Sequence, residues 1–449
     1  MTSTGPLLRD ATERAIAYLD GLDDRPVAPT EEAVEALAEL DEELPAAGAD
    51  PGETLALLDR VGSPGTMASA GGRYFGFVNG ATLPGSLAAH VLASAWDQNT
   101  ALAVMSPTAI RLRNVASRWM VELLGLPRSA EAMFVGGATV ANVCGLAAGR
   151  DHVLAEAGWD AAKDGLIGAP PVHVVVGESA HSTIAKSLSI VGLGRDRVIR
   201  VPADDQGRIV AGELPDLDGP VIVSCQAGEV NTGAFDPFSE IVDWARVRGA
   251  WVHVDGAFGL WAAASPQRRH LTEGMAGADS WATDGHKWLN VPYDSGIVFV
   301  RDAAALRSSM SAMAGYLPGG DLEPMHHTPQ SSQRARAVDA WAALRTLGRD
   351  GLAALVDRCS DHAVRFADGL TAAGHRVLND VVINQVLVRF GDDAETDRVI
   401  DEVQRSGECW CGPTAWRGER AMRISVSSWV TTDANVDRSL AAILRAAEG

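Results

Sequence analysis

The sequence contains no apolar run of about 18 residues, the length that a membrane-spanning helix requires. Its N-terminal segment also lacks the basic stretch and following apolar stretch of a secretory signal. Basic residues are few: 38 lysines and arginines stand against 58 aspartates and glutamates, and the formal net charge of −20 would repel a nucleic-acid backbone. We therefore expect a cytoplasmic protein that binds neither membranes nor nucleic acids.

Cysteine is scarce as well. The five cysteines include no CxxC pair, and no His/Cys spacing suits a metal ion. Cys409 and Cys411 are separated by one residue, which could suggest a redox or metal-binding pair. Because no histidine or third cysteine lies near them in the sequence, we interpret Cys409 and Cys411 as reduced thiols. The sequence predicts no metal site.

What is present is typical of a soluble enzyme: 47% of the 449 residues are hydrophobic and 21% are charged. Short apolar segments alternate with helical stretches such as Pro107–Gly125 and Val140–Ala157. The predicted strands are Ala132–Val135, Val172–Val176, Val198–Pro202, Val221–Cys225, Trp251–Asp255 and Ile297–Arg301. This alternation predicts an α/β fold with a doubly wound, mainly parallel sheet, which binds ligands beyond the carboxyl ends of its strands.

The chain divides into three predicted regions. Residues 1–60 form an N-terminal helical segment, and residues 61–330 form a large domain around the sheet. Residues 331–449 form a small α+β domain that begins with a long helix near Ser331. Its predicted antiparallel strands are Val382–Phe390 and Met422–Ser428.

Two short motifs carry the strongest chemical signal. Trp251-Val-His-Val-Asp255 places a carboxylate at the end of an apolar strand, and Asp284-Gly-His-Lys287-Trp places a lysine in a tight turn. Pyridoxal phosphate (PLP) needs both, because a lysine forms a Schiff base with its aldehyde and a carboxylate keeps its ring nitrogen protonated. Opposite charges at ~4 Å in an effective dielectric of ~20 attract by ~4 kcal/mol. Either residue alone is more simply an ordinary strand-end acid or surface lysine, but the two motifs together predict PLP.

A glycine-rich turn offers a place for the PLP phosphate. Gly137, Ala138 and Thr139 follow a predicted strand and open a predicted helix. The glycine lets the backbone approach an anion, the threonine supplies a hydroxyl, and the helix N-terminus supplies unpaired N–H groups. No Gly-Lys-Ser/Thr follows, so the turn is not a P-loop. Because Gly-Gly before a helix is common, this turn by itself is a weak signal.

Three further polar residues are candidates for contact with the cofactor. His181 follows the strand over 172–176, where its ring could stack on the cofactor or simply bond to a helix N-terminus. His286 could donate to the phosphate or orient Lys287. Asn231, with its neighbour Thr232, could reach the phenolic oxygen of the cofactor or cap a turn.

These motifs resemble those of the group II PLP-dependent amino acid decarboxylases, which include aromatic amino acid, histidine, glutamate and cysteine sulfinate decarboxylases. The likeness extends from Tyr74 to the C-terminus. The resemblance implies the aspartate aminotransferase-like fold (PLP fold type I), with a mainly parallel seven-stranded sheet in the large domain. It also implies a homodimer with active sites at the interface, in which N-terminal helices such as residues 6–20 pack on the partner.

The resemblance also assigns roles to residues. Lys287 is implied as the Schiff-base lysine, Asp255 as the partner of the pyridinium and His181 as the residue that stacks on the ring. The other positions implied around the cofactor are Gly137, Ala138, Thr139, Asn231, Ala257 and His286.

The chain departs from the family pattern at two places. The family usually has Asn where this chain has Asp284, and because a carboxylate would repel the phosphate, we expect Asp284 to turn away or to bond another group. The family also has a tyrosine in a mobile loop that protonates the substrate carbon, but the loop after Tyr316 contains none. His326 or His327 could replace that acid, because imidazole transfers protons well at neutral pH. The missing tyrosine could instead direct the carbanion toward oxygen.

Substrate selectivity is predicted to come from Phe77, Asn79 and Arg423, and from partner residues near Trp96–Met105. Phe77 suits an apolar side chain but could be a core residue, and Asn79 suits a polar one. Arg423 could meet a carboxylate through its planar guanidinium or pair with a structural acid. Aromatic, acidic and small polar amino acids all remain open as substrates.

The leading functional hypothesis is decarboxylation of an L-amino acid to an amine and CO2. An aldehyde synthase, a C–C lyase or an aminotransferase on the same scaffold is the alternative. A third possibility is a PLP-fold protein that has lost turnover and serves as a partner or regulator. The presence of both Lys287 and Asp255 argues against it, because a degenerate site would need neither.

Overall fold

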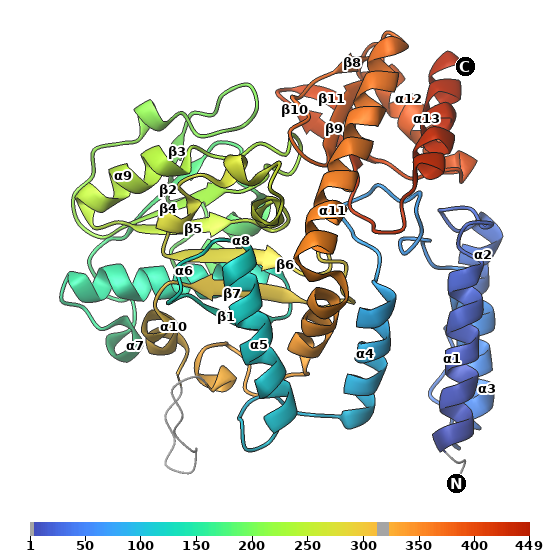
Figure 1. Ribbon diagram of the computed structural model, residues 1–449, viewed down its shortest axis with the longest axis horizontal. Helices are drawn as coiled ribbons and strands as arrows, with labels where there is room; N and C mark the ends of the chain where they lie inside the picture. The colour runs from blue at the N-terminus through green and yellow to red at the C-terminus, as the bar shows by residue number, and fades with distance from the viewer. Residues whose placement is uncertain (1–3, 312–322) are drawn as a thin grey trace. The chain divides into compact units, whose positions relative to one another are not determined.

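The computed structural model describes residues 4–311 and 323–449 (Figure 1). The chain forms two compact units. The larger unit consists of residues 82–361 and 379–385, and the smaller unit combines residues 1–81, 362–378 and 386–449. The predicted three-part division by residue range stays a prediction.

A seven-stranded sheet forms the core of the larger unit, in the order β1-β7-β6-β5-β4-β2-β3. The strands are β1 (Glu131–Val135), β2 (His173–Gly177), β3 (Val198–Val201), β4 (Val221–Gln226), β5 (Trp251–Asp255), β6 (Ser280–Asp284) and β7 (Gly296–Val300). Neighbours are parallel except that β7 runs antiparallel to both β1 and β6. The mainly parallel seven-stranded sheet is thus confirmed, and β6, which the apolar pattern did not predict, is its seventh member.

The larger unit also contains helices on and beside this sheet (Figure 1). They are α4 (Pro84–Trp96), α5 (Pro107–Leu123), α6 (Ala138–Glu156), α7 (Ala161–Asp164), α8 (Ser182–Ile190), α9 (Phe238–Arg248), α10 (Ala303–Met310) and the first part of α11 (Arg336–Ala372). The long helix expected near Ser331 therefore begins at Arg336, and Gly348 with φ of 62° interrupts it. Helix α6 packs across β5, β6 and β7, and its apolar residues join the strand side chains in one buried core.

The smaller unit holds a four-stranded sheet in the order β10-β11-β9-β8. Its elements are α1 (Thr4–Asp20), α2 (Glu31–Glu35), α3 (Pro51–Leu57), β8 (Arg376–Val377), β9 (Gln385–Arg389), α12 (Asp393–Ser406), β10 (Gly412–Trp416), β11 (Glu419–Ser425) and α13 (Asp433–Glu448). β10 pairs antiparallel with β11, and β8 pairs antiparallel with β9. Both of these pairs are antiparallel, as the alternating pattern predicted, although β9 and β11 end earlier than predicted.

The five cysteines are buried free thiols. Burial raises the pKa of Cys144 to about 12 and that of Cys359 to about 11, so both stay protonated at neutral pH. Among the described residues, no helix combines the length and the apolar character that a membrane span requires.

Candidate active site

The carboxylate of Asp255 lies at the carboxyl end of β5 and is only 5% exposed. Its Oδ2 accepts a hydrogen bond from the side-chain amide of Asn142 at 3.1 Å, and its Oδ1 accepts one from the backbone N–H of Ala257 at 3.2 Å. Both donors are neutral. The carboxylate is therefore oriented from two sides without an ion pair among these contacts, as a residue that must face a cationic ligand requires.

Lys287 lies in the turn that follows the neighbouring strand β6. The turn is closed by the N–H of Gly285, which donates to Ser295 O at 2.6 Å, and by Asn290, whose side-chain amide donates to Lys287 O at 3.3 Å. A Cβ on Gly285 would lie 2.7 Å from Ser295 Oγ, so only glycine fits there. Nζ of Lys287 lies 5.8 Å from the ring centre of Phe258. Since β5 and β6 are parallel neighbours, the acid and the lysine share one edge of the sheet.

The predicted phosphate cradle is the turn between β1 and α6. Gly137 precedes α6 with φ of 155°, a conformation that side chains other than glycine rarely adopt. The N–H of Ala138 donates to Asp284 Oδ2 at 2.9 Å, while Thr139 O accepts from Ser187 Oγ at 3.2 Å. The first turn of α6 thus faces the end of β6, where its N–H groups and its positive dipole end favour an anion.

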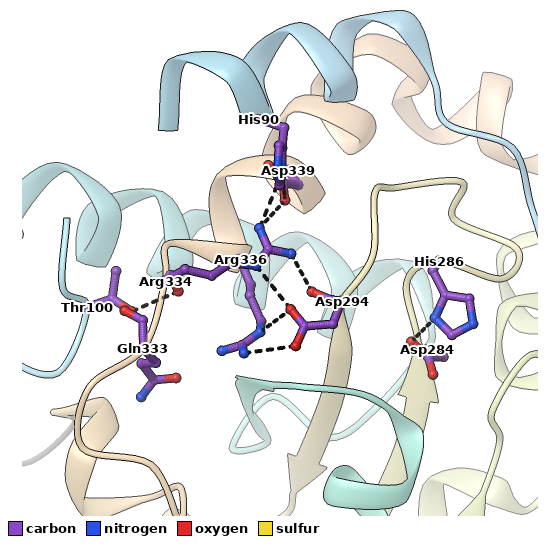
Figure 2. Close-up of polar contacts among 9 residues, drawn as sticks. All are labelled: His90, Thr100, Asp284, His286, Asp294, Gln333, Arg334, Arg336 and Asp339. Atoms are coloured by element: carbon purple, nitrogen blue, oxygen red, sulfur yellow. Dashed lines mark hydrogen bonds and ion pairs between the residues drawn. The ribbon is translucent and has the colours of Figure 1, made fainter. Parts of the chain in front are cut away.

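Asp284 links this cradle to His286. Its Oδ1 lies 2.6 Å from Nδ1 of His286 (Figure 2). Its Oδ2 accepts the N–H of Ala138. The ring of His286 stacks on Tyr293 with centroids 4.1 Å apart. As expected, the acid bonds other groups, but it does so at the mouth of the cradle and does not turn away from it. The pair thereby fixes the imidazole beside the cradle.

His181 is the N-cap residue of α8. Its Nδ1 accepts the N–H of Thr183 at 3.3 Å, and its own N–H donates to Gln226 Oε1 at 3.2 Å. Gln226 ends β4 and is the register partner of Asp255. His181 therefore caps the helix, as one of the two interpretations predicted. The cap holds its ring near the end of β4, the strand next to the one that ends in Asp255. Stacking of this ring on a cofactor stays a prediction.

Asn231 and Thr232 form a turn around the buried carboxylate of Glu229. Asn231 donates its N–H and its side-chain amide at 2.7 and 3.1 Å, and Thr232 donates its N–H at 2.8 Å. The Thr232 hydroxyl donates to Gln206 O at 2.7 Å. Burial raises the pKa of Glu229, and these hydrogen bonds oppose the rise. The described contacts are those of a capped turn, so contact of Asn231 with a cofactor stays a prediction.

His326 and His327 are both buried, in the described part of the predicted loop. Nδ1 of His327 lies 2.9 Å from Glu323 O, and Nδ1 of His326 lies 3.2 Å from Ser311 Oγ. Burial lowers the pKa of His327, which favours its neutral form. Tyr316 and the first part of the predicted loop, residues 317–322, lie outside the described residues. A catalytic role for either histidine stays a prediction.

Three predicted substrate residues belong to the smaller unit. Phe77 is 61% exposed at φ of 51° and stacks on Trp410 with ring centroids 5.3 Å apart. Asn79 is half-buried in the turn that follows, and its N–H donates to Gly76 O. Arg423 lies on β11 opposite Gly412. Phe77 is therefore not a core residue, while substrate contact by any of the three stays a prediction.

A cluster that the sequence did not predict follows Lys287 in the chain. Arg334 and Arg336 both bind the carboxylate of Asp294, with Nε to Oδ1 distances of 3.0 Å, and Arg334 also binds Asp339 at 3.0 Å (Figure 2). Although burial raises the pKa of Asp294, its hydrogen bonds to Arg336 and Arg334 hold it below the usual value. A Cβ on Gly136 would lie 3.1 Å from Asp294 Oδ2. The cluster thus ties the start of α11 to the turn beside the cradle.

Residues 61–390 match the model of the pyridoxal-dependent decarboxylase conserved domain. The chain belongs to this family. It is 32% identical to an L-2,4-diaminobutyrate decarboxylase of Rhizobium meliloti (strain 1021), over 68% of this chain and 63% of that protein. It is 26% identical to an aromatic-L-amino-acid decarboxylase of Bacillus atrophaeus, over 81% of this chain and 75% of that protein.

A solved structure shares the fold. The crystal structure of Oryza sativa TDC with PLP and tryptamine superposes with a TM-score of 0.91 at 21% identity, covering all of this chain and 99% of that one. The fold is therefore that of the PLP fold type I decarboxylases, and the family is one of PLP-dependent carboxy-lyases.

The residues at the sheet edge fit PLP. A buried carboxylate ends β5 with a neutral donor on each of its oxygens, as suits a pyridinium partner. A lysine follows the adjacent strand. A glycine at φ of 155° opens the N-terminus of α6, where a larger residue would be strained. Lys287, Asp255 and the first turn of α6 are thus suited to hold the aldehyde, ring nitrogen and phosphate of the cofactor.

Proposed function

We propose that this protein decarboxylates an L-amino acid to the corresponding primary amine and CO2, with Lys287 as the residue that binds PLP. The observation that carries the proposal is the pairing of Asp255 and Lys287 on adjacent strand ends. The chain contains only three lysines, and the other two, Lys163 and Lys186, are exposed on α7 and α8. Lys287 is the one in the turn after β6, the strand that lies next to the one ending in Asp255.

When bound, PLP accepts the electron pair that is left on the substrate carbon as a bond to it breaks. Asp255 keeps the proton on the ring nitrogen through an attraction of ~4 kcal/mol. The rigid cap of His181 on α8 holds an imidazole at the neighbouring strand end, where it can lie against the ring. His286, fixed by Asp284, and the first turn of α6 stabilise the phosphate.

Return of a proton to the substrate carbon requires an acid, and we assign this role to His326 or His327. Both are enclosed, so the segment that carries them would have to shift before either could reach the substrate. The alternative outcome is oxidative. An aldehyde synthase, the 4-hydroxyphenylacetaldehyde synthase of Rhodiola rosea, is among the relatives. Equal amounts of amine and CO2 support decarboxylation, whereas aldehyde with ammonia and peroxide supports the oxidative reaction.

We further propose that Phe77, Asn79 and Arg423 select the substrate side chain. Phe77 supports this because its ring is exposed and yet held in place by Trp410. A panel of the twenty amino acids with 2,4-diaminobutyrate, followed by mass analysis of the products, identifies the substrate. A Phe77→Ala variant with an unchanged order of preference would contradict this assignment.

We infer that the active form is a homodimer with active sites at the interface. Large apolar side chains are exposed on α4 and on the segment after it, where a monomer would leave them in water. They are Val91, Leu92, Trp96, Val104 and Met105. Light scattering on the purified protein should give twice the chain mass of 47.2 kDa, and a monomer that is fully active would refute the inference.

Replacing the lysine tests the proposed function. Lys287→Ala should lose turnover on every amino acid of the panel, because no other amine lies at the sheet edge among the described residues. Lys186→Arg is the matched control, since it alters an exposed lysine on α8 and should keep the rate of the unmodified protein. If Lys287→Ala decarboxylates as fast as this control, the proposed function is wrong.

A further inference from the structure

A continuous chain of hydrogen bonds runs from Asp255 into the interior of the larger unit. Asn142 donates to Asp255 Oδ2 at 3.1 Å, and its Oδ1 lies 2.9 Å from Nε2 of His253. Nδ1 of His253 lies 2.8 Å from the hydroxyl of Ser280, which accepts the indole N–H of Trp251 at 2.9 Å. These five residues, which we call the Asp255 relay, are all buried.

Two faces that pack together build the relay. Trp251, His253 and Asp255 alternate along β5, so their side chains point to the same side of the sheet. Helix α6 packs on that side, with Asn142 near its start. A Cβ on Gly145 would lie 2.6 Å from the His253 ring, and a Cβ on Gly149 would lie 2.6 Å from the Trp251 ring.

These two glycines have a physical reason. Glycine inside a helix is less favourable than alanine by roughly 0.5–1 kcal/mol. Helix α6 nevertheless has glycine at the two positions where the rings of His253 and Trp251 approach its backbone. The two glycines therefore lower the intrinsic stability of α6 but leave space for the rings of the relay.

The direction of each hydrogen bond follows from the donors. An indole nitrogen can only donate, so the Ser280 oxygen accepts from Trp251 and its hydroxyl hydrogen is left for His253 Nδ1. The amide of Asn142 must turn its NH2 toward the carboxylate, which leaves its oxygen for the N–H on His253 Nε2. Burial lowers the pKa of His253 to about 3, so the ring is neutral and has one donor and one acceptor, as this order requires.

We propose that His253 is a positioning residue for the reaction, which acts through Asn142 to hold the Asp255 carboxylate in the orientation that pairs with the ring nitrogen of PLP. This inference rests on the proposed function. His253 touches neither substrate nor cofactor in this scheme. Its N–H fixes the Asn142 amide, and that amide fixes one carboxylate oxygen while the Ala257 N–H fixes the other.

The relay explains how the buried carboxylate of Asp255 can be held in place and still pair with the protonated ring of PLP. A carboxylate held by neutral donors keeps its charge for the ligand, whereas an ion pair inside the protein would neutralise it. If the amide were free to rotate, the carboxylate could turn away, and binding of the protonated ring would weaken.

The test measures PLP binding rather than turnover. The full-length protein, freed of cofactor, is titrated with PLP while its visible absorption and its dissociation constant are followed. His253→Leu keeps the volume and removes both ring nitrogens, so PLP should bind about tenfold more weakly. His253→Gln can still donate to Asn142 and should recover most of the affinity. Asn142→Ala should match His253→Leu, and the double variant should be no worse than either one, because both break the same link.

Trp281→Phe is the matched control. Its indole is also fully buried and donates to Met275 O at 3.1 Å, but it is not part of the relay. This variant should lower the melting temperature without changing the affinity for PLP. If His253→Leu also lowers only the melting temperature, the relay is merely structural and the inference is wrong.

Two outcomes keep this inference separate from the proposed function. If the unmodified protein gives no visible absorption with excess PLP, the proposed function fails and the inference falls with it. If the unmodified protein binds PLP but His253→Leu binds equally well, only the inference fails. Should His253→Leu not fold, Ser280→Ala removes one link further away and should weaken PLP binding about threefold. An unchanged affinity in that variant would overturn the inference.

Discussion

Asp255 and Asp284 end neighbouring parallel strands and are about equally buried, at 5% and 4% exposed, yet they are held in different ways. Asp255 receives neutral N–H groups from Asn142 and Ala257 and is connected to the interior by the relay. Asp284 contacts an imidazole and the first N–H of α6. The difference teaches that burial alone does not decide the use of an acid. The first carboxylate keeps its charge for a ligand, and the second uses its charge to fix a side chain and a helix.

The largest expected effect comes from neutralising the first acid. Asp255→Asn removes the ~4 kcal/mol attraction that keeps the cofactor nitrogen protonated. The turnover rate should fall roughly a thousandfold, since each 1.36 kcal/mol corresponds to a factor of ten. Steady-state kinetics with saturating PLP measures it. A decrease of less than tenfold would show that the two strand-end acids do not differ as described.

A smaller effect, on the stability of the fold, is expected when a methyl group fills the space between α6 and the relay. Gly145→Ala places a methyl group 2.6 Å from the His253 ring, and the overpacking should destabilise the fold by about 1–3 kcal/mol. Gly351→Ala in α11 is the control, because its nearest neighbour outside the helix backbone is Leu347 Cβ at 3.4 Å. The control should stabilise by roughly 0.5–1 kcal/mol. Denaturant unfolding of both variants checks the opposite signs, and equal signs would contradict the packing argument.

Because His253 in the Asp255 relay is neutral, the free energy of unfolding should depend on pH. Burial lowers the pKa of this residue from 6.5 to about 3, so the folded state disfavours the charged ring. The contribution of neutral His253 to the stability of the fold is complete above pH 6.5 and is lost as the pH falls toward 3. In this range the histidine of the unfolded chain binds a proton while that of the folded protein does not. The slope should approach about 1.4 kcal/mol per pH unit below pH 6. Unfolding at several pH values should show this slope in the unmodified protein and a shallower one in His253→Leu.

The smallest expected effect concerns the second acid. Asp284→Asn keeps an oxygen for the Ala138 N–H but removes a negative charge from the mouth of the cradle. PLP should bind about threefold more tightly, because less than about 1 kcal/mol of repulsion near a helix N-terminus is relieved. Titration with PLP and with pyridoxal, which lacks the phosphate, separates the effect: only PLP should gain. Weaker binding of PLP would contradict this, because it would mean that the hold of Asp284 on His286 outweighs the repulsion between the carboxylate and the phosphate.

Much of the sheet could be predicted from sequence, because apolar runs of β-branched residues mark buried parallel strands. Each of the six predicted large-domain strands begins and ends within one residue of an observed strand, namely β1, β2, β3, β4, β5 or β7. Strand β6 was missed because Ser280-Trp-Ala-Thr-Asp284 has no such run; its burial comes from the neighbours on both sides.

Site residues that stand in short sequence motifs were predictable, whereas contacts between residues far apart in the sequence were not. Asp255 and Lys287 stand in short motifs, so their spacing alone predicted the cofactor. Asn142 and His253 are 111 positions apart, and Asp294 meets Arg334 from 40 positions away. A signal for the relay was nevertheless present, since a strand with Trp, His and Asp at alternate positions and a helix with glycines four apart both depart from an ordinary core.

The most direct test of the account is the position of the covalent link to PLP. Borohydride reduction of the protein loaded with PLP converts the imine to a stable amine, and peptide mass mapping then locates it among the three lysines. The account predicts one pyridoxyl group, on Lys287. A label on Lys163 or Lys186, or no label with excess PLP, would contradict it.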